Sequence, residues 1–263
     1  NPRRGMPAAS ANSCSSASDS SLTRCAHSRS RCRHLGSSIS TAIATYHHTM
    51  TAPEVELRAA WLQLGGSGHE HLLQQVLAHH REPHRRYHTA VHVMWVLRHV
   101  AELAAAQATP LDVPALQLAA LYHDIVYDPR ATDNEARSAA LARQAAVELG
   151  WPADRADLVH RWVEATAHRH DAPAAEHVDA HEAVLLDADL AILGAAPAEY
   201  QAYVHGVRAE YQHVPASAWR TGRAEVLRGF LARPQLFLTA TMRAARESRA
   251  RANLTAELAT LTS

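Results

Sequence analysis

Apolar residues recur at intervals of three and four along most of the chain after about residue 54, and this spacing constrains the fold more than any other feature. Between residues 88 and 106 the spacing is carried by Val93, Val96, Val100 and Leu103. It places apolar side chains on one face of an α-helix. No stretch alternates apolar and polar residues convincingly between turn residues, as a strand would. The sequence therefore predicts an all-α fold, a single multi-helix bundle.

Prolines, glycines and capping patterns set the expected helix boundaries. Pro129 ends one helix and Gly150 closes another. The stretch "TDNE" at 132–135 is typical of a capping box, with Thr132 as the N-cap and Glu135 reaching back to it. The expected helices lie at about residues 54–64, 69–80, 88–106, 114–127, 132–149, 152–168, 178–193, 197–212, 216–231 and 234–260.

Residues 1–49 differ from the rest of the chain. They are rich in Ser, Thr, Ala and Arg, contain a single acidic residue, and hold all three cysteines, Cys14, Cys25 and Cys32. Such a composition buries too little apolar area to offset chain entropy. We predict a disordered Ser/Arg-rich extension over 1–49 and a folded domain over 50–263. The extension is interpreted either as a stretch ahead of a natural start at Met50 or as an organelle transit peptide.

The composition of residues 50–263 excludes several classes of function. The chain contains arginine but no lysine, which excludes functions that need a P-loop lysine or a Schiff-base lysine. The segment is mildly acidic, which argues against nucleic-acid binding. It has no cysteine and no apolar run near the roughly 18 residues of a membrane helix. We expect a cytoplasmic protein that binds neither nucleic acid nor membrane, with its oligomeric state left open.

Polar residues interrupt three of the apolar helices. "LYHDIVYD" (121–128) sets His123 beside Asp124, and "LLDADLAILG" (185–194) puts Asp189 on an apolar stripe. His88 and His92 share a helix face at a spacing of four. A buried carboxylate must be paired or bound to a metal. His92, His123, Asp124 and Asp189 together suit Mn, Fe, Co, Ni, Zn or Mg, with Asp187 as a rival to Asp189.

This pattern resembles the HD-domain superfamily of predicted metal-dependent phosphohydrolases, in an uncharacterised bacterial branch. The resemblance covers nearly all of residues 54–245 and rests on blocks that occur in order: "EPHRRYHTAVHV" (82–93), "LYHDIVYD" (121–128), "DNEARSAALA" (133–142), "ATAHRH" (165–170), "LLDADLAILG" (185–194) and the segment 208–234. It implies an HD-type bundle with His92, His123, Asp124 and Asp189 as metal ligands in its core. "YHTAVH" is also similar to a helix of cyclic-nucleotide phosphodiesterases, which implies that His88 is a proton donor.

The expected function is metal-dependent hydrolysis of a small phosphate ester of nucleotide-like kind. His88 would protonate the leaving oxygen, and Asp124 or Asp128 would orient the attacking water. Asp128 can equally be a polar residue that ends a helix before Pro129. Candidates for substrate contacts are Arg85, His168, Arg208 and Arg223.

Two other functions stay open. One is an HD-type di-iron oxygenase, which needs about six ligands, so that His168 and either His170 or His181 would have to join the set. The other is a non-catalytic module that senses nucleotides.

Overall fold

The computed structural model describes residues 52–168 and 178–262, and within these ranges the protein contains ten α-helices, one 3₁₀ helix and no strand. The prediction of an all-α fold is therefore confirmed for this part of the chain. The predicted extension over residues 1–49 lies outside the described residues.

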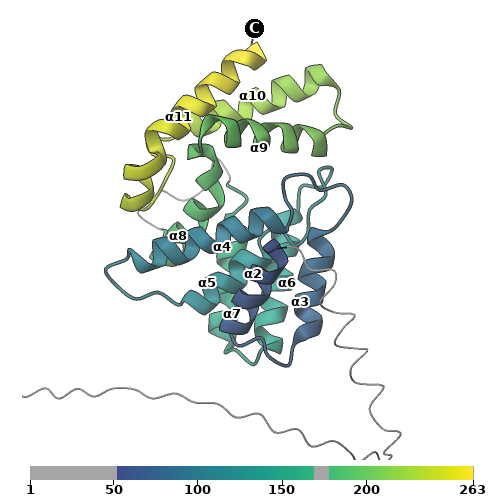
Figure 1. Ribbon diagram of the computed structural model, residues 1–263, viewed down its shortest axis with the longest axis vertical. Helices are drawn as coiled ribbons and strands as arrows, with labels where there is room; N and C mark the ends of the chain where they lie inside the picture. Colours follow the sequence, from purple (N-terminus) through teal and green to yellow (C-terminus); the bar gives the residue numbers. More distant parts are fainter. Residues whose placement is uncertain (1–51, 169–177, 263) are drawn as a thin grey trace, which may run out of the picture. The chain divides into compact units, whose positions relative to one another are not determined.

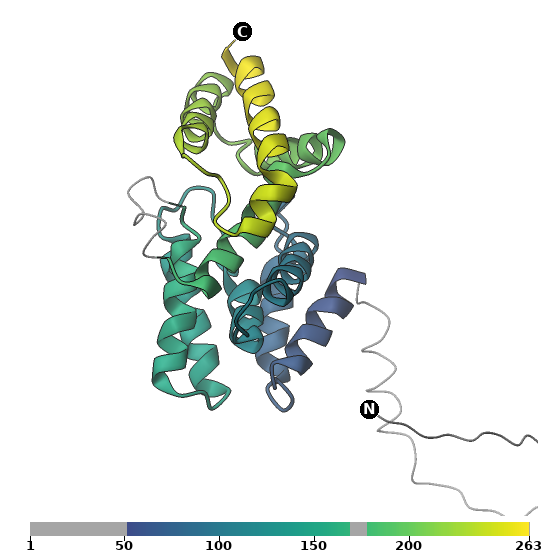
Figure 2. The ribbon, with the colours of Figure 1, turned by 90° about the vertical axis from the view of Figure 1, so that its left-hand side faces the viewer.

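The helices follow one another as α2 (Ala52–Gln63), α3 (Glu70–His80), α4 (Ala90–Ala105), α5 (Val113–Tyr122), α6 (Asn134–Glu148), α7 (Ala153–Ala165), α8 (Ala180–Asp189), the 3₁₀ helix η2 (Leu190–Gly194), α9 (Pro197–Glu210), α10 (Ala216–Ala232) and α11 (Ala240–Thr262). Figures 1 and 2 agree in placing α9, α10 and α11 at one end and α2 to α7 at the other. The α8–η2 segment joins the two groups, since α8 packs on α4 and η2 packs on α9 and α11.

Helix α4 belongs to the group formed by α2 to α7 and packs against α2, α5 and α8. Its predicted apolar stripe is confirmed, because Val93, Val96, Val100 and Leu103 are all at most 1% exposed. Residues on this stripe recur once per turn, so one continuous face can be buried against three neighbours. This packing brings the first turn of α4 close to the end of α5 and the end of α8, where His123 and Asp189 lie.

The helix expected over 114–127 ends earlier, at Tyr122, and the prediction that His123 and Asp124 lie within it is wrong. Both residues lie in the turn that follows α5. The carbonyls of Asp124 and Ile125 accept hydrogen bonds from the buried Arg85 guanidinium at 2.8 and 2.9 Å instead of from later helical N–H groups. A partner distant in sequence thus takes the bonds that would continue the helix.

Two predicted helix starts also differ from the structure. Helix α4 begins at Ala90 behind the N-cap Thr89, so His88 precedes the helix. The predicted capping box is wrong, because the N-cap of α6 is Asp133 and no side chain caps it. The side chain of Asn134 is bound to the backbone N–H and carbonyl of Asp128, and this contact fixes where α6 starts.

Two of the four helices predicted from residue 178 onward also have clearly different bounds. The helix expected over 178–193 divides into α8 and η2, and the helix expected over 234–260 begins only at Ala240.

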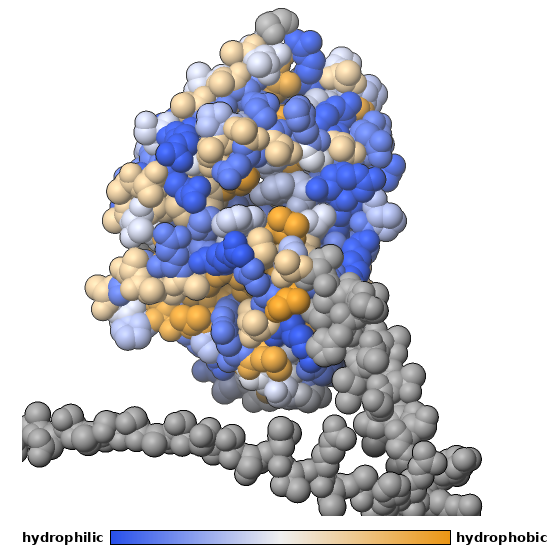
Figure 3. Space-filling view, viewed as in Figure 1, coloured by the Kyte–Doolittle hydropathy of each residue, from blue (hydrophilic) through white to orange (hydrophobic). Residues whose placement is uncertain are grey.

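The surface of the described residues mixes polar and apolar side chains. Figure 3 shows one face, on which small apolar areas lie among hydrophilic residues. Trp95 of α4 is 48% exposed, and the Arg98 guanidinium lies 4.7 Å from the centre of its ring. No helix within residues 52–168 and 178–262 combines the length and apolar character that crossing a membrane requires.

Helices α6 and α7 pack against each other through small side chains, which gives a test of the fold. Ala139, Ala142 and Ala146 of α6 and Ala156 of α7 have no exposed surface. We expect Ala142→Leu to lower the free energy of unfolding by about 1–3 kcal/mol, because added methylene groups cannot fit between the helices. Ala140 is exposed on the same helix, and Ala140→Leu should change it by less than about 0.5 kcal/mol. Urea denaturation measures both, and equal effects would contradict the packing described.

Candidate metal centre

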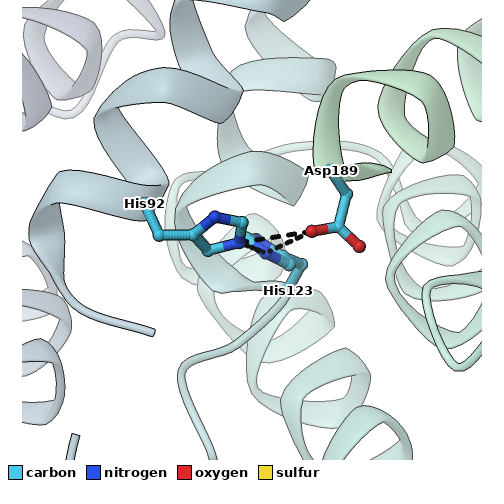
Figure 4. A group of neighbouring side chains, drawn as sticks. All are labelled: His92, His123 and Asp189. Carbon is cyan, nitrogen blue, oxygen red and sulfur yellow. Dashed lines mark hydrogen bonds and ion pairs between the residues drawn. The ribbon is translucent and has the colours of Figure 1, made fainter. Parts of the chain in front are cut away.

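Three helix ends bring the predicted ligands together. His92 lies in the first turn of α4, His123 directly follows α5, and Asp189 is the last residue of α8. Figure 4 shows the two imidazole rings meeting, with the carboxylate of Asp189 pointing toward them. His92 and His123 are 5% and 1% exposed, and Asp189 is half-buried.

The distances among these side chains are short. His92 Nε2 lies 3.0 Å from His123 Nε2 and 3.2 Å from Asp189 Oδ1. Asp124 Oδ2 lies 3.1 Å from His123 Nε2 and 3.4 Å from His92 Nε2. One ligand atom from each of His92, His123 and Asp189 lies within 4.8 Å of the others. His92, His123 and Asp189 therefore converge, and Asp124 contacts both histidines.

A backbone contact fixes the orientation of the His123 ring. Its Nδ1 lies 2.8 Å from the carbonyl of Ala120, which can only accept a hydrogen bond, so Nδ1 must donate. In the neutral imidazole this leaves the lone pair on Nε2, which faces the cluster. Histidines that bind metals are held in the same way, with one nitrogen donating to a carbonyl and the other turned to the ion.

In the cluster the histidines favour the protonated, positive form and the aspartates favour the ionised, negative form. Burial alone would lower the pKa of His92 and His123, but the Asp124 and Asp189 carboxylates raise both. Burial would likewise raise the pKa of Asp124 and Asp189, but the facing histidines hold both well below the usual range. Any cation that binds here must displace the protons that the imidazoles share with the carboxylates.

The donor set fits a divalent metal ion. Two neutral imidazoles cannot both turn an Nε2 lone pair toward a contact of 3.0 Å without a proton or a cation between them. Two nitrogens and two carboxylate oxygens match the ligands of Mn, Fe, Co, Ni and Zn. The His92, His123 and Asp189 cluster can therefore hold a metal ion, with Asp124 beside it.

Asp189, and not its rival Asp187, belongs to this cluster. Asp187 is 1% exposed and accepts hydrogen bonds from the backbone N–H groups of Leu238 and Thr239, both at 2.7 Å. These groups lead into α11, so the carboxylate of Asp187 satisfies backbone donors at the start of that helix.

His168, predicted as a substrate contact, lies beside the cluster. It follows α7 with a positive φ of 48°, which is uncommon for a residue with a side chain. Its Nε2 donates to Asp189 Oδ2 at 2.8 Å, and its carbonyl accepts from Arg233 Nη2 at 2.8 Å. The two oxygens of Asp189 thus face different histidines, so the site extends toward His168 and Arg233.

Glu210, at the end of α9, is a site residue that the sequence analysis missed. Its Oε1 accepts from the backbone N–H groups of Arg86, Tyr87 and His88 at 2.7–3.0 Å. Its Oε2 accepts from His88 Nδ1 at 2.8 Å and from the Tyr127 hydroxyl at 2.9 Å. Nothing in the spacing of "RAEYQHV" distinguishes Glu210 from a solvent-exposed glutamate, so no sequence signal could have found it.

These contacts govern the charge of Glu210. Burial alone would raise its pKa, but the hydrogen bond and the charge of His88, together with the backbone donors, lower the pKa to about 2. Glu210 is therefore a carboxylate that holds the His88 ring by Nδ1 and leaves Nε2 free for other partners.

The three arginines predicted as phosphate contacts are engaged elsewhere. Arg85 is buried and donates to Glu82 and to the carbonyls of His88, Asp124 and Ile125. Arg208 donates to the carbonyls of Tyr211 and Val214. Arg223 is 9% exposed and donates to Glu257 and Tyr203. The observed contacts favour structural roles for all three.

Asp128 lies in the loop between α5 and α6. Its Oδ1 accepts from the backbone N–H of Arg130 at 2.9 Å, and its side chain is exposed. Within the described ranges no hydrogen bond or ion pair joins Asp128 to the His/Asp cluster. It does line a cavity of about 540 Å³ together with Tyr127, Arg130 and Glu210. This cavity has the size of a small-molecule site and adjoins the residues that hold His88.

Comparisons of the chain with family models, with curated proteins and with solved structures found no match. The interpretation of the site therefore rests on its geometry and on the order of its motifs in the sequence.

The two aspartates of α8 give a direct test of the cluster. We expect Asp189→Asn to lose most bound metal, because a ligand oxygen and its charge are removed. Asp187→Asn should keep the metal but lower the free energy of unfolding by about 1–3 kcal/mol, because a buried backbone donor loses its acceptor. Elemental analysis after dialysis against Mn²⁺, with urea denaturation in parallel, measures both. Metal loss in Asp187→Asn with retention in Asp189→Asn would contradict the assignment.

Proposed function

We propose that this protein is a metal-dependent phosphohydrolase of the HD type, acting on a small phosphate ester of nucleotide-like kind. The observation that carries the proposal is the convergence of His92, His123 and Asp189, with an Asp124 oxygen 3.1 Å from His123 Nε2. His88, which Glu210 holds by Nδ1, lies beside this cluster. Each of these groups comes from a motif on which the resemblance to the HD superfamily rests. Their order along the chain and their convergence both support the proposal.

His92, His123, Asp124 and Asp189 would hold the metal. When bound, a divalent cation would act as a Lewis acid toward the phosphoryl group and toward water. Asp124 Oδ2 faces the histidines, whereas Asp124 Oδ1 makes no hydrogen bond to any other described residue. Oδ1 is therefore the oxygen that would orient the attacking water.

His88 would supply the proton to the leaving oxygen. Glu210 accepts a hydrogen bond from His88 Nδ1, so Nδ1 keeps its proton and Nε2 is the nitrogen that would donate a proton to the leaving oxygen. The three backbone bonds to Glu210 hold the carboxylate itself in place, which fixes the ring before substrate arrives. Glu210 is a positioning residue in this scheme, since it would act on the substrate only through His88.

The substrate would enter by the cavity that Tyr127, Asp128 and Glu210 line. Arg130 lies on its wall, and Arg233 contacts His168 beside Asp189. We propose these two guanidinium groups as phosphate contacts, because Arg85, Arg208 and Arg223 each donate to two or more protein acceptors.

One observation favours a second candidate function, the di-iron oxygenase. His168 contacts the outer oxygen of Asp189, so a carboxylate lies between two sets of histidines as it would between two metals. Of the further ligands that this function would need, His181 accepts from the backbone N–H of Asp112 and stacks on Trp162, and His170 lies outside the described residues. The described residues therefore supply five of the about six ligands that two irons would need, but all four of those proposed for one cation.

Removing the carboxylate of Asp124 tests the proposed hydrolase. We expect the full chain, loaded with Mn²⁺, to hydrolyse at least one member of a panel of nucleoside monophosphates and simple phosphomonoesters. Asp124→Ala should lose both the metal and the activity. Asp154→Ala, which removes an exposed carboxylate on α7, is the matched control and should keep both. The assay is phosphate release, with metal content measured by elemental analysis.

Three results would contradict the hydrolase. Asp124→Ala could keep metal and activity. The protein could contain about two irons per chain and consume oxygen, which favours the oxygenase. It could show nucleotide-dependent thermal stabilisation without turnover, which favours the sensing module.

The contact between Glu210 and His88 predicts how a variant responds to the leaving group. We expect Glu210→Gln to lower kcat roughly 10²-fold for an alkyl phosphate, because His88 Nδ1 loses the carboxylate that accepts its proton and balances the charge of the protonated ring. For p-nitrophenyl phosphate, whose leaving group needs no proton, kcat should change little. Glu225→Gln, on the exposed face of α10, is the control. Equal losses for the two substrates would indicate a purely structural role for Glu210.

A further inference from the structure

The hydroxyl of Tyr87 has no part in the scheme described so far. Tyr87 lies in the segment before α4, directly ahead of His88, and its side chain is half-buried. The centre of its ring lies 4.9 Å from the ring centres of both His88 and His92. The side chain therefore lies against the proposed proton donor and against one of the proposed metal ligands.

This hydroxyl has no hydrogen-bond partner among the described residues, although two neighbouring tyrosines use theirs. The Tyr127 hydroxyl donates to Glu210 Oε2, and the Tyr203 hydroxyl accepts from Arg223. The Tyr87 hydroxyl is not fully buried either, so solvent and a ligand can both reach it. A half-buried hydroxyl without a protein partner is free to bond to a ligand.

The carboxylates of the metal centre act on this hydroxyl. Burial first, and after it the neighbouring Tyr203 and the charges of Asp189 and Asp124, hold its pKa well above the usual range. Tyr87 is therefore a neutral hydroxyl that can donate a hydrogen bond. Because the effect of a charge falls with distance, the hydroxyl lies near the carboxylates that would bind the metal.

Two contacts with α9 fix the place of Tyr87. Its backbone N–H donates to Glu210 Oε1 at 2.8 Å. Gly206 approaches it so closely that a Cβ at this position would lie 3.1 Å from Tyr87 Cβ. Any side chain on residue 206 would have to displace Tyr87, so the glycine permits the close approach. The hydroxyl is therefore held in place before a ligand binds, as a donor toward developing charge must be.

We propose that Tyr87 is a further catalytic residue, whose hydroxyl donates a hydrogen bond to a non-bridging oxygen of the phosphoryl group. This inference rests on the proposed hydrolase function and names a contact that the function leaves open. His88 serves the leaving oxygen and Asp124 the attacking water, so neither supplies a donor to the non-bridging oxygens. Negative charge spreads over these oxygens during phosphoryl transfer, and Tyr87 stabilises it.

Tyr87 adds to the two arginines proposed as phosphate contacts and does not replace them. Arg130 lies on the wall of the cavity, and Arg233 contacts the carbonyl of His168. The Tyr87 ring, in contrast, lies directly against the ring of the metal ligand His92. Its hydroxyl is therefore the donor closest to where the metal would hold the reacting phosphoryl group.

The test compares two tyrosine-to-phenylalanine variants of the full chain loaded with Mn²⁺. The Tyr122 hydroxyl also lacks a partner among the described residues but is fully buried, so Tyr122→Phe is the matched control. Calorimetric titration measures the binding of orthovanadate, an ion that imitates the transferring phosphoryl group. We expect Tyr87→Phe to raise its Kd roughly 10- to 100-fold, because a hydrogen bond to a charged oxygen is lost. Tyr122→Phe should leave the Kd unchanged, and both variants should keep their metal content.

Kinetics with two substrates separate this role from an effect on His88. We expect Tyr87→Phe to lower kcat for an alkyl phosphate and for p-nitrophenyl phosphate by the same factor, roughly 10-fold or more. The reason is that both substrates present the same non-bridging oxygens. A loss confined to the alkyl phosphate would show that Tyr87 acts only through His88 and would overturn the proposal.

Four other results would overturn the proposal. If Tyr87→Phe bound orthovanadate as tightly as the wild type, the hydrolase would stand without this contact. Equal losses in Tyr87→Phe and Tyr122→Phe would indicate an indirect effect of either substitution. Loss of Mn²⁺ from Tyr87→Phe would mean that the hydroxyl supports the ligands instead of the substrate. If the wild type neither bound orthovanadate nor released phosphate from any substrate, the proposed function would fail together with this inference.

Discussion

The guanidinium of Arg85 is the interaction on which the site depends. It is fully buried and donates to the carbonyl of His88 on one side and to those of Asp124 and Ile125 on the other. These bonds tie the segment before α4 to the turn after α5. Five donors in a rigid fork make this possible, and a lysine could not replace them. The same charge, after burial, lowers the pKa of His80 to about 3 and keeps that buried ring neutral.

Once these two segments are joined, electrostatics determines the rest of the cluster. His92 and His123 face each other, and the carboxylates of Asp124 and Asp189 lie within about 3.6 Å of their ring nitrogens. Isolated charges at such buried positions would be very unfavourable, and pairing removes most of that cost. The cluster therefore holds opposite charges in balance and can exchange protons for a cation without gaining unpaired charge.

The C-terminal helices contribute to the site through a continuous chain of buried contacts. Glu257 of α11 accepts from Arg223 at 2.8 Å, and Arg223 donates to the Tyr203 hydroxyl at 3.1 Å. The Tyr203 ring lies 4.8 Å from that of Tyr87, which in turn lies 4.9 Å from the ring of His92. With Glu210 at the end of α9, these helices form the wall that supports His88 and His92. Arg223, which the sequence suggested as a phosphate contact, instead joins α10 to α11 and α9.

The helical class, and the polar residues that stand among the apolar ones, could be predicted from the sequence alone. Helical periodicity is local, so the buried stripe of α4 could be read from neighbouring residues. His92, His123, Asp124 and Asp189 were recognisable because each is anomalous among its own apolar neighbours. The tertiary structure decided where α5 ends, which carboxylate of α8 faces the histidines, and that Glu210 holds His88. The partners in those contacts lie 39 to 124 residues apart along the chain, and no local pattern records which distant group will accept a hydrogen bond.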